Sequence, residues 1–552
     1  MNLARTQTGR TVRRAPGPGA VLAALAAAQF TVMLATSIVN VALPQIRAGA
    51  GLSDGGTTWV VNAYGLAFGA LLLAGGRVAD LLGRRRVLLA GLALFALASL
   101  AAGLGTSAGV LIAARAVQGL GAAAIAPAAL ALAMDGPSYG PGRGRALGVW
   151  GAVSGAGAAG GVLLGGVLTQ AWGWPWIFHS VAVAAALVLA AVMVLVPRDA
   201  ARPSLSDLAG SAPPGTAPRR TAAAPEYVQY TGAPAAHRGT APDGADLTDK
   251  IRKRRPSRGG RFDLLGTATI TLALTCLVWG LTTARGVGWG DAGVLGSLGG
   301  AVVLLAAFCA IEVRRPDALV PLRLLTAGRV AAGNVLMALL GSVWIALFFF
   351  LPLYQQQVLG ASPLITGLGQ LPLAAVHMFG SALAPRISRR IGATATATAA
   401  LLTEAAGLLW LSRISADGSY LADVLGPSVL IGLGLGVAFV QLTALAVEGV
   451  PGRDAGLAGG LVNTTRQVGG AIGLAALATL AGSVTAHASA GQAPLEALTA
   501  GYRTAFAVSA GVLAATAVLA VFLTRRTGAR TPATTTTPTT NPTVLSRVPL
   551  NR

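Results

Sequence analysis

The chain alternates long apolar stretches with short segments of charged residues, glycine and proline. Most of the apolar stretches approach the length of about 20 residues that a transmembrane helix needs, and the pattern predicts a helix over each one. The first group covers 20–44, 57–75, 87–104, 108–133, 146–168 and 177–197, and the second covers 264–284, 293–312, 330–354, 364–385, 392–411, 424–447, 457–481 and 501–524. Fourteen spans are an even number, so both termini are expected on one side of the membrane.

The composition excludes several classes of protein. Of the 552 residues, 54% are hydrophobic and only 11% are charged, whereas about a quarter of a soluble protein is charged. An ordinary soluble enzyme, a disordered chain and a disulfide scaffold are therefore excluded. The two cysteines, Cys276 and Cys309, each lie inside an apolar stretch, which indicates ordinary helix residues rather than a disulfide.

The positive charge is concentrated on one side of the predicted membrane. The formal net charge is +22, from 41 Lys and Arg residues against 19 Asp and Glu. With the N-terminus inside, the outer connections hold Arg47, Arg285, Arg413 and Arg503, the spans hold Arg115 and Arg466, and every other Lys and Arg falls on the inner side. This asymmetry follows the positive-inside rule, so both termini are expected in the cytoplasm. Topology and contact with anionic lipids then explain the charge without a nucleic-acid partner.

The first apolar stretch has two interpretations. Arginines precede it, as they would in a secretory signal peptide. The apolar core of a signal peptide is about 7–15 residues long. The stretch 20–44 is longer and further spans follow it, which favours an uncleaved first helix.

Two polar segments interrupt or end the apolar pattern. Residues 198–262 are rich in Pro, Ala, Gly and Arg and have no helical period, which predicts a disordered cytoplasmic linker. Its basic run at 250–255, KIRKRR, lies just before a span and is expected to contact anionic headgroups; a regulatory docking site is the alternative. Residues 527–552, rich in Thr and Pro, are predicted to be a disordered tail.

The connection after the second span carries a motif of specific spacing. Residues 76–86 read GRVADLLGRRR. Gly83 permits a tight turn, and Asp80 can accept charge-assisted hydrogen bonds from a helix N-terminus or an arginine. A basic turn that only sets topology is the alternative. The segment resembles the loop signature of the major facilitator superfamily, G-x-L-A-D-R-x-G-R-R, at Gly76, Ala79, Asp80, Gly83, Arg84 and Arg85. The resemblance implies a loop that controls conformational switching.

Further segments are similar to one branch of that superfamily, the fourteen-helix drug:proton antiporters. They are IVNVALP at 38–44, RAVQGLG at 115–121, GVWG at 148–151, GVLLGG at 161–166, FDLLG at 262–266, GVGW at 286–289 and the segment 463–470. The third and fourth of these are similar to the branch's antiporter signature in the fifth helix, and the fourth contains Gly161, Gly165 and Gly166.

The resemblance implies an all-α membrane protein with the major facilitator fold, in which two six-helix bundles are joined by two extra transmembrane helices. The chain then divides into a cytoplasmic N-terminus (1–19), an N-terminal bundle (20–197), the linker (198–262), the two additional helices (263–313), a C-terminal bundle (325–526) and the tail (527–552). The implied function is export of small amphipathic compounds, such as drugs or antibiotics, from a bacterial cytoplasmic membrane. The implied partners are the substrate and protons, and we expect a monomer.

Two positions depart from the branch. Ala35 stands where the first helix usually carries an acid, and Val162 replaces the proline of the antiporter signature. Both positions are associated in the family with proton coupling or transport direction. Uptake, or export of another metabolite or lipid without the usual coupling, is therefore the alternative function.

Two charged residues within spans are candidates for proton coupling. Only Glu404 among the acids falls well inside a span, and Ala397, Ala400 and Gly407 share its face. Small residues mark helix contacts, so Glu404 is expected to be interior, either titrating or paired with an arginine such as Arg466. Exposing the charge of Arg115 to lipid would be costly, so this residue is expected to face the protein interior or a wet cavity. There it either contacts the substrate or the proton path, or it braces neighbouring helices.

Several polar residues are candidates for the substrate cavity. They are Asn40, Asn62, Tyr64, Gln118 and Arg466. Hydrogen bonding between helices is the alternative role for such residues. His377 is expected to be a buried neutral histidine satisfied by a carbonyl. The chain has no zinc-ligand spacing, nucleophile elbow or phosphate loop, so neither catalysis, a metal nor a cofactor is expected.

The linker gives a first testable prediction. Protease added outside intact cells should leave residues 198–262 uncut, whereas protease added to inverted vesicles should cleave there, because the basic run holds this segment in the cytoplasm. The cleavage sites can be mapped by mass spectrometry. Cleavage in intact cells and protection in inverted vesicles would contradict the topology.

Overall fold

The computed structural model describes residues 17–134, 143–197, 263–314, 328–450 and 455–528. Within these residues lie fourteen helices of at least 19 residues. The first six are α1 (Pro18–Gly49), α2 (Asp54–Leu82), α3 (Arg84–Leu104), α4 (Ala108–Met134), α5 (Arg143–Trp172) and α6 (Pro175–Leu195). The others are α9 (Leu264–Val287), α10 (Ala292–Arg314), α12 (Gly328–Gln357), α14 (Leu371–Ile391), α15 (Ala393–Leu411), α16 (Gly426–Ala446), α17 (Ala455–Ala488) and α18 (Pro494–Gly528).

Each predicted span overlaps one of these helices. Twelve of the helices in the described part of the chain are long and apolar enough to cross a membrane by composition alone; α5 and α14 are the remaining two. Arginines end α14. The linker, most of the N-terminus and nearly all of the tail lie outside the described residues.

The prediction of one helix over 364–385 is wrong in detail. The short helix α13 (Pro363–Gly369) ends at Gln370, and α14 begins at the next residue. Proline at the second position of α14 explains the break, because Pro372 has no N–H to continue the ladder of α13. A π-helical turn, η1 (Tyr420–Leu425), also precedes α16.

Local signals start and stop the helices. The Ser53 side chain accepts a hydrogen bond from the Gly56 amide at the start of α2, and Ser362 does the same for Ile365 at α13. These caps satisfy amides that a helix leaves unpaired. Gly83 and Gly392 have φ values of 101° and 85°, which allow the tight connections α2–α3 and α14–α15.

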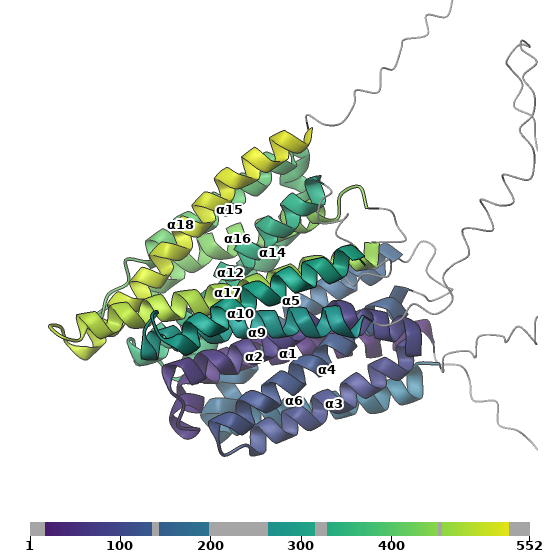
Figure 1. The fold of residues 1–552 in the computed structure, drawn as a ribbon, viewed down its shortest axis with the longest axis horizontal. Helices are drawn as coiled ribbons and strands as arrows, with labels where there is room; N and C mark the ends of the chain where they lie inside the picture. The colour runs from purple at the N-terminus through teal and green to yellow at the C-terminus, as the bar shows by residue number, and fades with distance from the viewer. Residues whose placement is uncertain (1–16, 135–142, 198–262, 315–327, 451–454, 529–552) are drawn as a thin grey trace, which may run out of the picture.

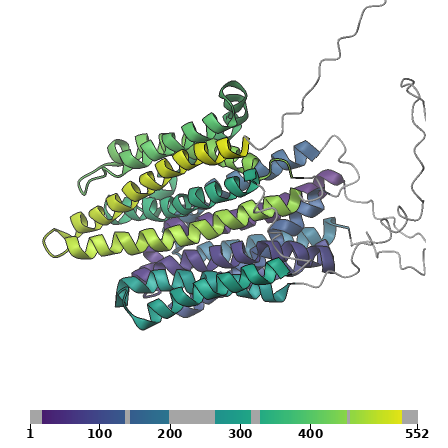
Figure 2. The same cartoon turned by 45° about the horizontal axis from the view of Figure 1, so that its top comes forward.

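The helices form two bundles and a peripheral hairpin. In the first bundle α1 packs against α5, α2 against α4, and α3 against α4 and α6; in the second, α12 packs against α17, α14 against α16, and α15 against α16 and α18. The hairpin α9–α10 lies beside α2 and α17. Figures 1 and 2 show the purple and blue first bundle, the green and yellow second bundle and the teal hairpin along their side. The predicted architecture of two six-helix bundles plus two helices is confirmed.

Glycines allow α1 and α5 to approach closely. A Cβ atom added to Gly161 would lie 2.7 Å from the Leu34 carbonyl oxygen, and one added to Gly165 would lie 2.5 Å from the Ile38 carbonyl oxygen. Real Cβ atoms do not come so near, so only glycine fits here. Two of the three signature glycines, Gly161 and Gly165, therefore pack α5 against α1 within the first bundle.

The two bundles are joined at one end of the molecule. We call the end where α1 begins and α18 ends the termini end, and the opposite one the far end. At the far end Gln356 Nε2 donates to the Val41 carbonyl at 2.6 Å, and the Leu364 amide donates to Gln170 Oε1 at 3.3 Å. Gly166 on α5 also packs there against the Pro363 carbonyl, 2.5 Å from where a Cβ would lie.

Gly166 gives a prediction about this closure. Gly166→Val should weaken the contact between α5 and α13, since overpacking costs about 1–3 kcal/mol. We expect roughly tenfold faster labelling of Leu364→Cys by a membrane-impermeant maleimide added at the far end, in a protein whose Cys276 and Cys309 are alanine.

The matched control is Gly160→Val on the same helix. A Cβ there would make only ordinary contact with the Phe30 ring, at 3.6 Å. Equal labelling rates for both valine variants would show that the Gly166 contact does not hold this end closed.

Candidate functional site

Arg115 is a hydrogen-bonded centre inside the first bundle. Its side chain is 1% exposed. Nε donates to the Val60 carbonyl at 3.0 Å, and Nη1 donates to the Ala35 carbonyl at 3.4 Å and to Gln118 Oε1 at 2.6 Å. Four helices are thus tied together, because Gln118 Nε2 in turn donates to Ser99 Oγ at 2.7 Å. This geometry favours a bracing role for Arg115 over direct contact with the substrate or the proton path.

Tyr64 on α2 adds a ring and a hydroxyl to this network. The Arg115 guanidinium stacks over its ring, with Cζ 4.3 Å from the ring centroid. The Tyr64 hydroxyl donates to the Val32 carbonyl at 3.1 Å and accepts from Thr36 at 3.2 Å. Ala35, where the branch carries an acid, contributes only its carbonyl to Arg115. Backbone carbonyls and the Tyr64 ring therefore surround Arg115, with no acid from this position of α1.

The two candidate asparagines have different surroundings. Asn62 Nδ2 on α2 donates to the Ala471 carbonyl on α17 at 3.3 Å, so it joins the two bundles. Asn40 on α1 is 8% exposed. The structure therefore places Asn62 between helices, as the alternative interpretation expects for an intramembrane asparagine.

Arg466 lies in the second bundle beside aromatic rings. Its Nη2 donates to Asn463 Oδ1 at 2.7 Å, and Cζ lies 5.1 Å from the Trp344 ring centroid. The Trp344 ring meets His377 edge-on at 5.4 Å and Phe439 at 5.3 Å. We call Trp344, His377, Phe439 and Arg466 the ring cluster; it draws on four helices, α12, α14, α16 and α17.

Sequence reasoning missed most of the ring cluster. Trp344 and Phe439 lie in uniformly apolar spans, where an interior ring cannot be distinguished from one that faces lipid. The expected carbonyl partner of His377 is not seen at Nδ1, which has no hydrogen-bond partner among the described residues. The convergence of four helices is the only signal for this cluster, and it is spatial.

Glu404 is completely enclosed in the second bundle. It is 0% exposed, and neither carboxylate oxygen has a hydrogen-bond partner in the described part of the chain. It lies where α15 meets α16, since a Cβ added to Gly434 would be 2.8 Å from the Glu404 Cβ. Arg466 instead donates to Asn463, so the predicted alternative of a Glu404–Arg466 salt bridge is not formed in this structure.

The loop signature is held by its own arginines. Arg84 donates to Asp80 Oδ1 from Nε at 3.1 Å and from Nη2 at 2.9 Å. Arg85 donates to the carbonyls of Val196 and Met193 at 2.8 and 2.9 Å, which fastens the start of α3 to the end of α6. Gly76 faces Pro127 of α4. The exposed Asp80 lies at the termini end, far along α2 from Tyr64.

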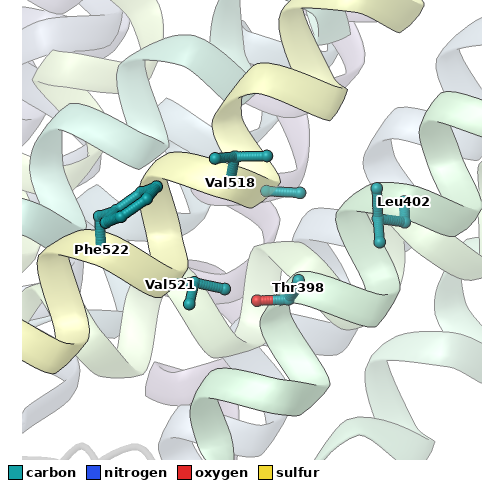
Figure 3. Close-up of a pocket in the computed structure, with 6 residues that line it drawn as sticks. Thr398, Leu402, Val518, Val521 and Phe522 are labelled. Atoms are coloured by element: carbon teal, nitrogen blue, oxygen red, sulfur yellow. The ribbon is translucent and has the colours of Figure 1, made fainter.

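Two hollows on the surface of the described residues are apolar. One, of about 260 Å³, lies between α15 and α18 and is lined by Leu402, Val518, Val521 and Phe522, with Thr398 as its polar member (Figure 3). The other, of about 530 Å³, lies along α2, α3 and α4 near Arg86. None of the candidate polar residues lines either hollow. Their apolar, outward-facing walls are suited to lipid acyl chains.

Comparison with known proteins defines the class. Residues 25–474 match the sequence profile of the Major Facilitator Superfamily, and the chain belongs to that family. The predicted family is thereby confirmed, and with it the class of membrane transporters. Among the described residues no group of three His, Cys, Asp or Glu side chains is placed to hold a metal ion.

Similar proteins carry names of export and resistance. The chain is 38% identical over 487 residues to the cephamycin export protein CmcT of Amycolatopsis lactamdurans, covering 88% of this chain and 89% of that protein. It is 38% identical over 519 residues to the puromycin resistance protein pur8 of Streptomyces alboniger, covering 92% of each. It is also 32% identical to the tetracenomycin C resistance and export protein of Streptomyces glaucescens, covering 84% of this chain and 76% of the relative.

A solved structure shares the fold at low sequence identity. A bacterial homologue of the human lysosomal transporter Spinster, in an inward-facing and unoccupied conformation, matches with a TM-score of 0.62 at 15% identity, covering 94% of this chain and 99% of that one. This likeness supports the fold alone.

Asp80 gives a prediction about the switch loop. Asp80→Asn removes the charge that Arg84 neutralises, so the loop loses its charge-assisted hydrogen bonds. We expect turnover to fall several-fold while the dissociation constant for substrate changes by less than about twofold. Asp417→Asn, which changes an exposed acid at the far end, is the control. A large loss of equilibrium binding in folded Asp80→Asn protein would place Asp80 in the binding site instead.

Proposed function

We propose that this protein exports small amphipathic compounds, drugs or antibiotics among them, by alternating access in exchange for protons. The observation that carries the proposal is the match, over most of both chains, to relatives named for antibiotic export or resistance. The geometry supports it: two bundles meet at the far end, and polar side chains face inward between them. Rocking of the bundles about such a contact would open each side in turn.

The direction of opening follows from topology. We propose that both termini are cytoplasmic, as the distribution of Lys and Arg indicates. The far end is then external, and the structure is a state closed to the outside. A substrate would enter from the cytoplasm or the inner leaflet and leave after the far-end contacts of Gln356 and Leu364 separate.

The candidate substrate residues are not equivalent. Gln118 and Arg115 are engaged with one another and with Ser99, and Asn62 holds Ala471. We propose that these residues preserve the helix arrangement. Arg466, which lies within electrostatic range of Tyr64, is left to meet substrate, and Asn40 on α1 is kept as a further candidate.

Glu404 is the proposed proton carrier. An ionised carboxylate enclosed without a cation or a hydrogen bond is very costly in a membrane interior. A change in the packing of α15 on α16 that admitted water would allow this carboxyl to gain or lose a proton. We propose that it takes a proton from the outside and releases it inside as substrate moves the opposite way.

Anionic lipids and a monomeric state also belong to the proposal. Basic residues at the termini end, such as Arg85 and Arg86, lie where anionic lipid headgroups would meet the protein. The protein is proposed to act as a monomer, because each chain holds both bundles and hence a complete path.

The test replaces the carboxyl of Glu404 with an amide. Glu404→Gln should abolish export driven by a proton gradient, since an amide cannot exchange protons, but leave downhill exchange of substrate measurable. Everted vesicles are assayed with cephamycin, puromycin and tetracenomycin C, with and without the gradient.

Glu496→Gln serves as the control, because it makes the same chemical change at an exposed position at the start of α18. Undiminished uphill accumulation by Glu404→Gln would remove Glu404 from the coupling mechanism. Absence of export by the unaltered protein for every compound would count against the proposed function itself.

A further inference from the structure

We infer that the ring cluster selects substrates that are planar, aromatic and negatively charged, with Arg466 binding the anionic group and Trp344 and Phe439 contacting the rings. The inference rests on the proposed function and adds a substrate class to it. It separates this protein from an exporter of lipophilic cations.

The ring cluster lies on the side of the second bundle that faces the first. Its four helices include those that touch the other bundle: α12 contacts α1, α14 contacts α5, and α17 contacts α2. Met378, next to His377, approaches α5 at Gly155. All four members are half-buried, so the cluster is neither sealed in the bundle interior nor spread over the lipid surface.

Arg466 lacks the partners that satisfy Arg115. Arg115 has three hydrogen-bond acceptors as well as a ring beneath it. Among the described residues, Arg466 has one acceptor, the neutral Asn463 side chain, and forms no ion pair. A guanidinium carries five N–H donors in a planar fork that fits a carboxylate. An anionic ligand would supply both the acceptors and the countercharge.

Neighbouring groups on α17 are also left unsatisfied. The Thr464 hydroxyl and both polar atoms of the Gln467 side chain are buried without a hydrogen-bond partner in the described part of the chain. Gln467 lies against Gly69 of α2, at the boundary between the bundles. Buried polar atoms are nearly always paired in native proteins, so a run of unpaired ones next to Arg466 marks a place for a polar ligand or water.

The helices that carry the ring cluster and those of the first bundle that face it contain almost no acidic residues. The helices α1, α5, α12, α14, α16 and α17 contain no Asp or Glu, and α2 carries its two acids only at its ends, Asp54 and Asp80. Glu404 is enclosed between α15 and α16 instead. In a low-dielectric interior the field of Arg466 is therefore uncompensated, which attracts an anion and repels a cation.

The rings define the rest of the ligand. Trp344 and Phe439 stand nearly perpendicular, with an interplanar angle of 79°. Such an arrangement offers a flat face and an edge to a third ring, and aromatic pairs favour both contacts. A flexible alkyl chain would use neither geometry, so a planar ring system is preferred.

The experiment uses three compounds that share one ring system: anthracene-9-carboxylate, the neutral 9-anthracenemethanol and the cationic 9-(aminomethyl)anthracene. Binding to the purified full-length protein is measured by calorimetry. We expect the carboxylate to bind at least about tenfold more tightly than the amine. Arg466→Gln should remove this preference, and Trp344→Leu should weaken binding of all three compounds.

Arg413→Gln is the matched control, because it removes the same charge from an exposed position at the far end; it should keep the preference. Equal or tighter binding of the amine by the unaltered protein would overturn the inference, as would an unchanged preference in folded Arg466→Gln. Failure of all three compounds to bind a protein that still exports another compound would overturn it too. Loss of export for every compound bears on the proposed function instead.

Discussion

The structure depends on the rule that a polar group inside a membrane must find its partner within the protein. Lipid offers no hydrogen bonds, so a membrane span must satisfy its backbone internally, and every described span is helical. The same rule governs side chains. Arg115 is tolerated at 1% exposure because carbonyls, an amide and the Tyr64 ring surround it. Each bundle can therefore be described by which of its polar groups are satisfied and which are not.

Close packing supplies the cohesion that apolar side chains cannot supply between helices in lipid. Gly161 and Gly165 bring α1 and α5 near enough for backbone contact, which gives dispersion contacts over their length. Gly434 does the same between α16 and α15, and it brings α16 against Glu404. Rigid bundles built in this way can move as units, so the contacts between them are what a transport cycle has to break.

The charged side chains inside the two bundles differ in whether they have hydrogen-bond partners. The first bundle encloses Arg115 within a complete network, which suits a brace. In the second bundle Arg466 has a single neutral acceptor. Neither carboxylate oxygen of Glu404 has a hydrogen-bond donor among the described residues. Unsatisfied groups of this kind cost stability, and that cost is reasonable where a substrate or a proton satisfies them during the cycle. The asymmetry supports a division of labour, with the first bundle as a scaffold and the second as the site of exchange.

The sequence by itself determined the number, order and approximate place of the helices, because the sum of about 20 apolar side chains decides whether a segment crosses a membrane. It also determined the family, through the loop signature around Asp80 and the motif that contains Arg115. Only the tertiary structure decided the closure at the far end and the partner of each polar side chain. Arg115 and Arg466 look alike in the sequence, each an arginine in an apolar span. They differ because helix rotation and packing bring Val60 and Ala35 to the first, and Trp344, more than 100 residues away, to the second.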